Sequence, residues 1–218
     1  MIHCKDISFK YPKSDFIFQL ADLNFESSQQ TAVIGPSGCG KTTFIHLLSG
    51  ILLPESGSIS IDNVIINQYK NNERRDFRIA TIGLIFQEFE LLEYLSVLDN
   101  ILLPYRINSI LQLDETVKQR AKDLADRVGL SNKLNRYPKQ LSQGERQRVA
   151  VCRALITQPK VLLCDEPTAN LDPENRDNII NILTQYCKVQ KTTLIVVTHD
   201  HDILNKFEQV VNLKSLIS

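Results

Sequence analysis

The stretch GPSGCGKTT at residues 35–43 decides how this chain folds. It follows an apolar run at 31–34 that predicts a strand, and it leads into an apolar segment at 44–48 that predicts a helix. The glycines let the backbone curl so that consecutive N–H groups face one point, and the start of a helix adds positive potential there. A glycine turn with only a structural role is the alternative. The strand and helix on either side favour a site for nucleotide phosphates.

Two side chains of this loop have chemistry of their own. Lys41 is expected to reach the β and γ oxygens of the nucleotide and to stabilise the γ-phosphate during hydrolysis. Thr42 would supply a hydroxyl to magnesium. The residues expected to bind nucleotide here are Gly35, Pro36, Ser37, Gly38, Cys39, Gly40, Lys41, Thr42 and Thr43.

A second apolar run, Val161 to Cys164, ends in two adjacent acids, Asp165 and Glu166. A strand that ends in a carboxylate can hold magnesium, so we expect Asp165 to stay ionised beside that ion. Glu166, one residue further, is placed to act as the general base on the attacking water. Two acids that only cap a loop are the structural alternative.

Length and composition limit the kind of protein. The chain has 218 residues, which suits one large domain or a core with an inserted subdomain. Lysine plus arginine balance aspartate plus glutamate at 25 each, so no bulk field favours nucleic acid. The five cysteines lack CxxC spacing, which suits a reduced cytosol. Apolar runs are shorter than the roughly 20 residues of a membrane span, so we expect no direct membrane insertion.

Strands and helices alternate along the chain. Continuous apolar runs such as 161–164 and 194–197 fit strands buried on both faces of a largely parallel sheet. The fold class is therefore α/β. Predicted strands cover 2–9, 16–25, 30–35, 57–61, 80–86, 160–165, 192–198 and 207–213. Predicted helices begin at Lys41 and cover about 114–128, 143–157 and 173–188, the last after an Asp172-Pro173 cap.

Between about 88 and 140 the pattern is mainly helical, which suggests a helical subdomain inserted into the α/β core. The polar segment 67–78 is interpreted as a solvated loop or a short helix without chemistry.

Residues 141–145, LSQGE, resemble the signature of ABC ATPases, which usually reads LSGGQ. Gln143 and Glu145 depart from that pattern, whereas Ser142 and Gly144 retain it. In that family the signature of one subunit completes the ATP site of its partner. The resemblance thus implies a homodimer around two ATP, with Ser142 and Gly144 binding the partner's nucleotide. A capping box between Ser142 and Glu145 at a helix start is the alternative.

The other motifs of the family follow in order. Gln87 resembles the Q-loop glutamine and implies a magnesium contact, Asn170-Leu171-Asp172 resembles the D-loop that links two sites, and His199 resembles the switch histidine that binds the γ-phosphate and orients water. Tyr11 stands where the family stacks an aromatic ring on adenine. Taken singly, Gln87, Asp172 and His199 also fit a strand terminator, a helix N-cap and a loop polar group, and Tyr11 fits a core residue.

The resemblance implies the ABC ATPase fold over one domain, residues 1–218. That fold has a P-loop NTPase core with a mostly parallel sheet, an N-terminal antiparallel β subdomain and an inserted helical subdomain. Its cofactors are ATP and Mg²⁺, and its activity is ATP hydrolysis coupled to transport.

Residues 82–104 and 165–172 are similar to the lipoprotein-releasing, macrolide-exporting and cell-division class of ABC ATPases. This likeness implies integral membrane partners that dock near 87–92, and a cytoplasmic position on the inner face of the cell membrane. The chain ends soon after Val211, so we expect no appended regulatory domain. The alternative is a soluble ABC ATPase of iron–sulfur assembly, repair or translation. The arginines at 146, 148 and 153 are interpreted as salt-bridge formers, without a nucleic-acid role.

Overall fold

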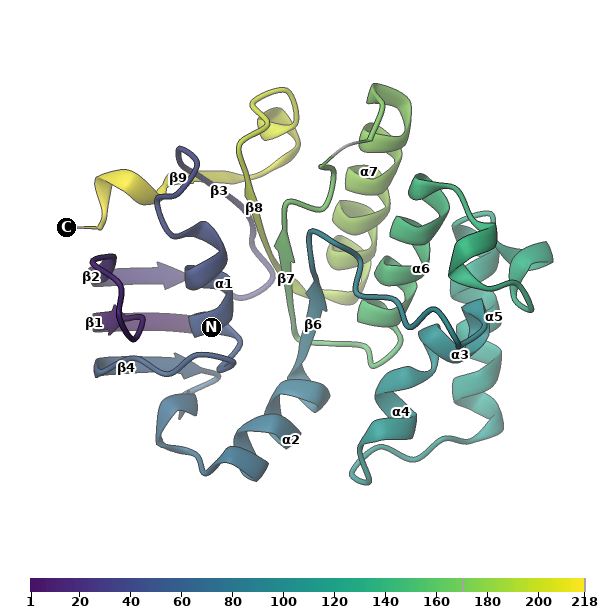
Figure 1. Ribbon diagram of the computed structural model, residues 1–218, viewed down its shortest axis with the longest axis horizontal. Helices are drawn as coiled ribbons and strands as arrows, with labels where there is room; N and C mark the ends of the chain where they lie inside the picture. Colours follow the sequence, from purple (N-terminus) through teal and green to yellow (C-terminus); the bar gives the residue numbers. More distant parts are fainter. Residues whose placement is uncertain (170, 218) are drawn as a thin grey trace.

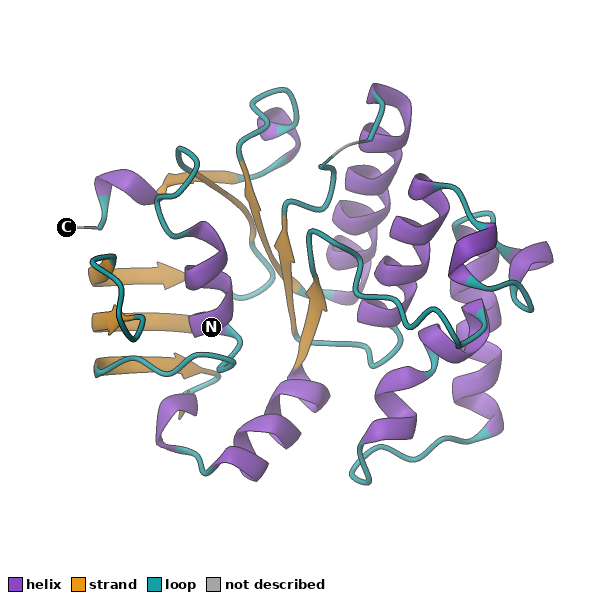
Figure 2. Cartoon of the chain, in the orientation of Figure 1, coloured by secondary structure: helices purple, strands orange, loops and turns teal. Residues whose placement is uncertain are grey.

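Two β-sheets lie side by side, and a group of helices covers the far face of the second sheet (Figures 1 and 2). The computed structural model describes residues 1–169 and 171–217, so Asn170 of the D-loop motif lies outside the described residues. Within these ranges no helix is both long and apolar enough to cross a bilayer. The predicted α/β class and the arrangement implied by the family resemblance are confirmed.

The first sheet is antiparallel and carries the N-terminus. Its strands are β1 (Ile2–Lys10), β2 (Ile17–Phe25), β4 (Ser56–Ile61) and β5 (Val64–Ile65), in the order β2-β1-β4-β5. Side chains of β1 and β2 largely alternate between buried and exposed, because one face packs on the core. The two-residue strand β5 was not predicted, since it is too short to show a period.

The second sheet is parallel throughout. Its strands are β3 (Gln30–Ile34), β6 (Ile82–Ile85), β7 (Val161–Asp165), β8 (Thr193–Thr198) and β9 (Gln209–Asn212), in the order β6-β7-β8-β3-β9. Strands β7 and β8 are buried at every position. The prediction from their continuous apolar runs, that these strands are covered on both faces, is therefore confirmed.

Each face of the parallel sheet has its own core. On one face, helix α1 (Lys41–Leu48) lies between the two sheets and packs with Leu163 and Ile195. On the other face, Leu162 and Cys164 pack with residues of four helices. These helices are α3 (Val97–Ile101), α5 (Glu115–Arg127), α6 (Gln143–Leu155) and α7 (Pro173–Gln190). Cys4, Cys152, Cys164 and Cys187 are buried core residues.

The segment predicted as a solvated loop or short helix forms helix α2 (Asn71–Thr81), and the strand that follows begins at Ile82 instead of residue 80. The Arg74 and Arg78 side chains hold α2 in place by donating to the Gly50 carbonyl. The remaining helix is α4 (Leu103–Ile107). Short 3₁₀ turns cover Ile66–Gln68, Ser131–Lys133, Pro138–Gln140, Leu204–Lys206 and Leu213–Ser215.

Candidate active site

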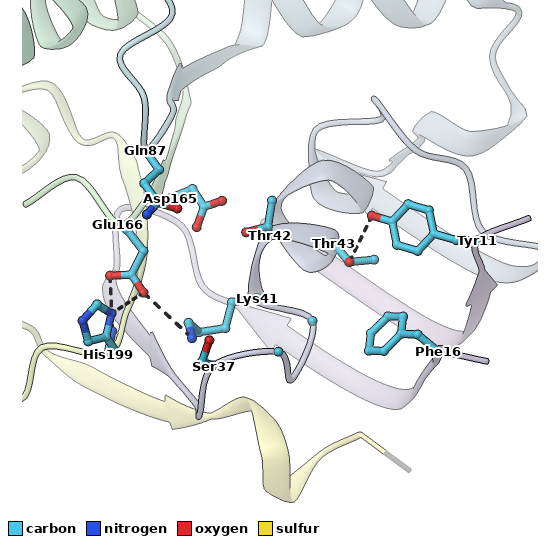
Figure 3. A pocket seen from close by; sticks show the side chains of 12 residues that line it. Tyr11, Phe16, Ser37, Lys41, Thr42, Thr43, Gln87, Asp165, Glu166 and His199 are labelled. Atoms are coloured by element: carbon cyan, nitrogen blue, oxygen red, sulfur yellow. Dashed lines mark hydrogen bonds and ion pairs between the residues drawn. The ribbon is translucent and has the colours of Figure 1, made fainter. Parts of the chain in front are cut away.

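A cleft of about 560 Å³ opens at the carboxyl ends of the parallel strands (Figure 3). The loop after β3, the segment after β6, the end of β7 and the end of β8 all reach it, as expected for ligand sites of open α/β sheets. Residues far apart in the sequence therefore meet at one edge. The cleft is lined by Tyr11, Phe16, Ser37, Gly38, Gly40, Lys41, Thr42, Thr43, Gln87, Asp165, Glu166 and His199.

The phosphate-binding loop has the predicted conformation. Gly38 and Gly40 have φ angles of 78° and 96°, in the left-handed region that favours glycine. Gly40 is also the N-cap of α1, so the helix begins at the loop. The Nζ of Lys41 donates to the carbonyls of Gly35 at 2.9 Å and Pro36 at 3.2 Å. These two carbonyls hold the lysine over the loop, next to the place where phosphates would bind.

The Glu166 carboxylate is buried and held from several sides. Its Oε1 lies 2.8 Å from Nδ1 of His199 and 3.8 Å from Nζ of Lys41, and its Oε2 accepts from the Thr198 hydroxyl at 3.2 Å. The backbone of Glu166 has φ 48°, a left-handed conformation that costs a non-glycine residue about 1–2 kcal/mol. Such strain concentrates at functional sites. The backbone N–H donates to the Val197 carbonyl at 2.9 Å, which fixes this conformation on β8.

The carboxylate of Asp165 fits a cation. It is 4% exposed, and its Oδ1 has no hydrogen-bond partner in the part of the chain that the structure describes. Burial raises the pKa of this carboxyl above its ordinary value; the Thr42 side chain opposes the rise and the neighbouring Glu166 adds to it. A divalent ion would remove that penalty. Carboxylate and hydroxyl oxygens are ligands that Mg²⁺ accepts, so Asp165 and Thr42 suit this ion.

Two aromatic rings lie at the other end of the cleft (Figure 3). Tyr11 packs edge-on against Phe9 with ring centroids 4.8 Å apart, and its hydroxyl lies 3.1 Å from Oγ1 of Thr43. Phe16 lines the same space and was missed from the sequence. A Cβ at Gly40 would fall 2.8 Å from the Phe16 ring, so this ring lies directly over the phosphate loop. The sequence held one clue to this role: Phe16 is an aromatic residue between Tyr11 and β2, close to the predicted adenine-stacking ring.

Six predicted site residues are not among those that line this cleft: Gly35, Pro36 and Cys39 of the phosphate loop, and Ser142, Gly144 and Asp172 of other segments. Ser142 and Glu145 form the capping box that was the alternative interpretation, and Asp172 caps α7. A capped serine still has its hydroxyl proton to donate, because its oxygen is the acceptor in the cap. A Cβ at Gly144 would fall 2.9 Å from Oδ1 of Asn175. A side chain at residue 144 would therefore displace the Asn175 amide, which also bonds to Arg148 and Asp172.

The departure from the family signature at Glu145 has a structural reason. Glu145 forms an ion pair with Lys133 and accepts from the Ser142 backbone N–H at 2.9 Å. The Lys133 hydrogen bond is the largest cause that lowers the pKa of Glu145. A depressed pKa means that the charged form stabilises the fold above the unfolded value of about 4.3, and that this is lost as pH falls through the folded pKa.

We expect E145Q to lower the free energy of unfolding by about 1 kcal/mol at pH 7, and by progressively less as pH falls below about 4. Urea unfolding at several pH values measures this difference. E115Q is the matched control, because the Glu115–Lys118 pair is exposed and contributes little. A pH-independent difference between wild type and E145Q would show that the Lys133 pair is not its origin.

The loop, the carboxylates and the strand ends together define a P-loop nucleoside triphosphatase. The family model described as "ABC transporter" matches residues 18–169. The chain is 36% identical over 216 residues to the lipoprotein-releasing system ATP-binding protein LolD of Colwellia psychrerythraea, over 98% of this chain and 83% of that one. It is 35% identical over 217 residues to an uncharacterized ABC transporter ATP-binding protein of Mycobacterium tuberculosis, over 98% and 87% of the two chains.

Among solved structures, the ATP-binding cassette MJ0796 in a dimeric post-hydrolysis state bound to ADP and Pi aligns with a TM-score of 0.87 at 30% identity, over 98% of this chain and 95% of that one. The chain belongs to the ABC transporter family as an ATP-binding cassette. It is an ATPase that hydrolyses ATP to ADP and phosphate.

Proposed function

We propose that this cassette works as a homodimer around two Mg-ATP and drives integral membrane subunits of the exporter or mechanotransmission type. The likeness to lipoprotein-releasing ATPases supports this class of partner. In this proposal residues 1–218 act as one domain with a helical subdomain at about 88–140. The cassette lies at the cytoplasmic face of the cell membrane and has no nucleic-acid partner.

The observation that carries the dimer is the separation of the predicted site residues. Lys41, Glu166 and His199 line one cleft, whereas Ser142 and Gly144 begin helix α6 outside it. A serine hydroxyl and backbone N–H groups at the start of a 13-residue helix form a donor set for a phosphate. A second copy that turns this donor set toward the cleft would complete the site, and the similar cassette MJ0796 is dimeric.

In the proposed mechanism each residue has one task. Lys41 leaves the carbonyls of Gly35 and Pro36 and neutralises the γ-phosphate oxygens, and a Tyr11 or Phe16 ring stacks on the base. Glu166 takes the proton of the attacking water, and His199 turns from Glu166 to bind the γ-phosphate. Thr42, Asp165 and Gln87 would hold Mg²⁺, which supplies positive charge against the developing negative charge.

A second cleft suits the membrane partner. It has a volume of about 350 Å³, lies between α2 and β6 on one side and α4 and α6 on the other, and includes Ile107 at its rim. Arg153 of α6 lines this cleft and donates at 2.5 Å to the carbonyls of Phe89 and Glu90, just after Gln87. A partner in this cleft would press on a segment that reaches both the nucleotide cleft and the signature helix.

The test is Mg²⁺-dependent ATP hydrolysis by the purified chain with and without its membrane subunit, with E166Q as the inactive control. We expect the membrane subunit to stimulate hydrolysis. I107D should leave basal hydrolysis unchanged but should weaken binding of the membrane subunit by about tenfold or more, because the new carboxylate would be buried at the interface without a counter-charge. Val189, 74% exposed on α7, offers V189D as a control matched to Ile107, 65% exposed.

Robust hydrolysis that is indifferent to any membrane subunit would contradict the transport role and favour the soluble class of ABC ATPases. If I107D and V189D lose stimulation by the membrane subunit equally, the proposed docking cleft is wrong, but the transport role is not contradicted.

A further inference from the structure

Arg176 in the first turn of α7 joins this helix to the loop that carries His199. Its Nη1 donates to Oδ2 of Asp200 at 3.3 Å and to Oδ2 of Asp202 at 3.1 Å. Both carboxylates belong to the segment directly after β8, and Asp200 is the neighbour of His199 in the sequence. The side chains of Arg176 and Asp200 are 20% and 23% exposed, so water screens this contact less than it screens an open surface pair, whereas the Asp202 side chain is 73% exposed.

Further along, the loop is anchored by the fully buried Ile203 and by Lys206, whose Nζ donates to Oδ1 of Asn181 on α7 at 3.5 Å. The Asp200 N–H donates to Oγ1 of Thr198 at 3.0 Å, and the Asp202 N–H donates to Oδ1 of Asp200 at 2.9 Å, which are bonds within the segment itself. The imidazole of His199 is 70% exposed and contacts Glu166. Close to His199, Arg176 supplies ion pairs between this loop and α7.

The helix that bears Arg176 is firmly placed. Asp172 caps it by accepting from the Asn175 N–H at 3.0 Å, and Asn175 in turn accepts from Arg148 of α6 at 3.2 Å. Deeper along α7, Ile179 and Ile180 are fully buried. A contact with this helix thus ties the His199 loop to a firmly packed part of the structure.

We propose that Arg176 is a positioning residue for His199: by fixing Asp200 and Asp202 on α7, it holds the histidine loop where the imidazole can reach the γ-phosphate. The proposal rests on the role proposed for His199. Arg176 is outside the residues that line the nucleotide cleft, so it acts through the loop and has no contact with nucleotide. It also joins the histidine of one site to the helix that starts at the D-loop aspartate.

We expect R176Q to lower kcat by about tenfold, comparable with one lost charged hydrogen bond, and to leave the KM for ATP within about twofold of wild type. R176K should restore part of kcat because it keeps the charge. D177N is the matched control: Asp177 also lies near Arg176, at 3.9 Å, but it is on the same helix, and within residues 1–169 and 171–217 its side chain makes no ion pair with the loop. D177N should retain wild-type kcat.

A double-mutant comparison distinguishes positioning from general destabilisation. If Arg176 acts through His199, R176Q should cause little further loss in an H199A background, whereas independent effects would multiply. Hydrogen exchange should rise at residues 199–206 in R176Q and stay unchanged in α6.

The proposal would be overturned if the losses of kcat in R176Q and H199A multiply in the double mutant, or if hydrogen exchange at residues 199–206 is unchanged in R176Q. Either result would do so even if R176Q is less stable overall. Wild-type activity in H199A would instead overturn the role proposed for the histidine, so the two failures are distinguishable.

Discussion

E166Q is expected to lose ATP hydrolysis by about 10²–10⁴-fold while it still binds ATP, because an amide cannot accept the proton of the attacking water. Glutamine keeps the size of glutamate and can still bond to Thr198 and His199, so the cleft should keep its shape. With hydrolysis blocked, the nucleotide-bound dimer should persist. Steady-state phosphate release and size-exclusion chromatography with Mg-ATP measure the two effects.

E26Q is a suitable control, since Glu26 is an exposed acid that follows β2, away from the cleft. If E166Q hydrolyses ATP within about threefold of wild type, the base is another group, and the assignment of Glu166 is wrong. If E166Q is inactive but stays monomeric with Mg-ATP, the homodimer proposal is wrong, whereas the assignment of Glu166 as the base stands.

K41A is expected to bind ATP at least about 100-fold more weakly, which corresponds to about 2.7 kcal/mol lost from contacts of the ammonium with phosphate oxygens. Without nucleotide K41A should also be somewhat less stable, because the Lys41 ammonium contacts two loop carbonyls and lies 3.8 Å from the buried Glu166 carboxylate, so each variant is compared with and without ATP. A ligand stabilises the folded state by an amount that grows with the logarithm of its concentration over Kd, so at the same ATP concentration the rise in Tm should be clearly smaller for K41A than for wild type.

K122A, which removes an exposed lysine of α5, should keep the full ATP-dependent rise in Tm. An equal rise in K41A would show that the loop backbone and the helix start supply most of the affinity without the lysine charge.

Much of the fold could be predicted because its strands carry strong signals. The runs at 161–164 and 194–197 are apolar at every position, and this occurs where a parallel strand is covered on both faces. The phosphate loop was equally clear, because its glycines need left-handed φ angles at fixed spacing. The loop and the run at 161–164 predicted Lys41, Asp165 and Glu166, and the family resemblance predicted His199; the structure brings the four into one cleft.

Helix α2 was less predictable because it contains no buried residue. It has few apolar residues, and its place is set by arginine contacts with the carbonyls of residues 49 and 50, which are distant in the sequence. Phe16 was missed for a similar reason: whether an aromatic residue lines a cleft depends on how its loop returns over the phosphate loop. From the sequence alone, Arg176 is an ordinary charged residue on a helix. Its role could not be predicted because its contacts with the loop after β8 depend on the tertiary structure.

The bonds of Glu166 to His199 and its closeness to Lys41 have a consequence for the cell. In the single chain the base faces its own histidine and lysine, and the proposed phosphate donors of α6 lie outside the cleft. On the proposed arrangement, a copy without a partner lacks both a free base and a complete phosphate shell. Copies that remain monomeric would then form an inert reserve, and would spare the nucleotide pool instead of draining it.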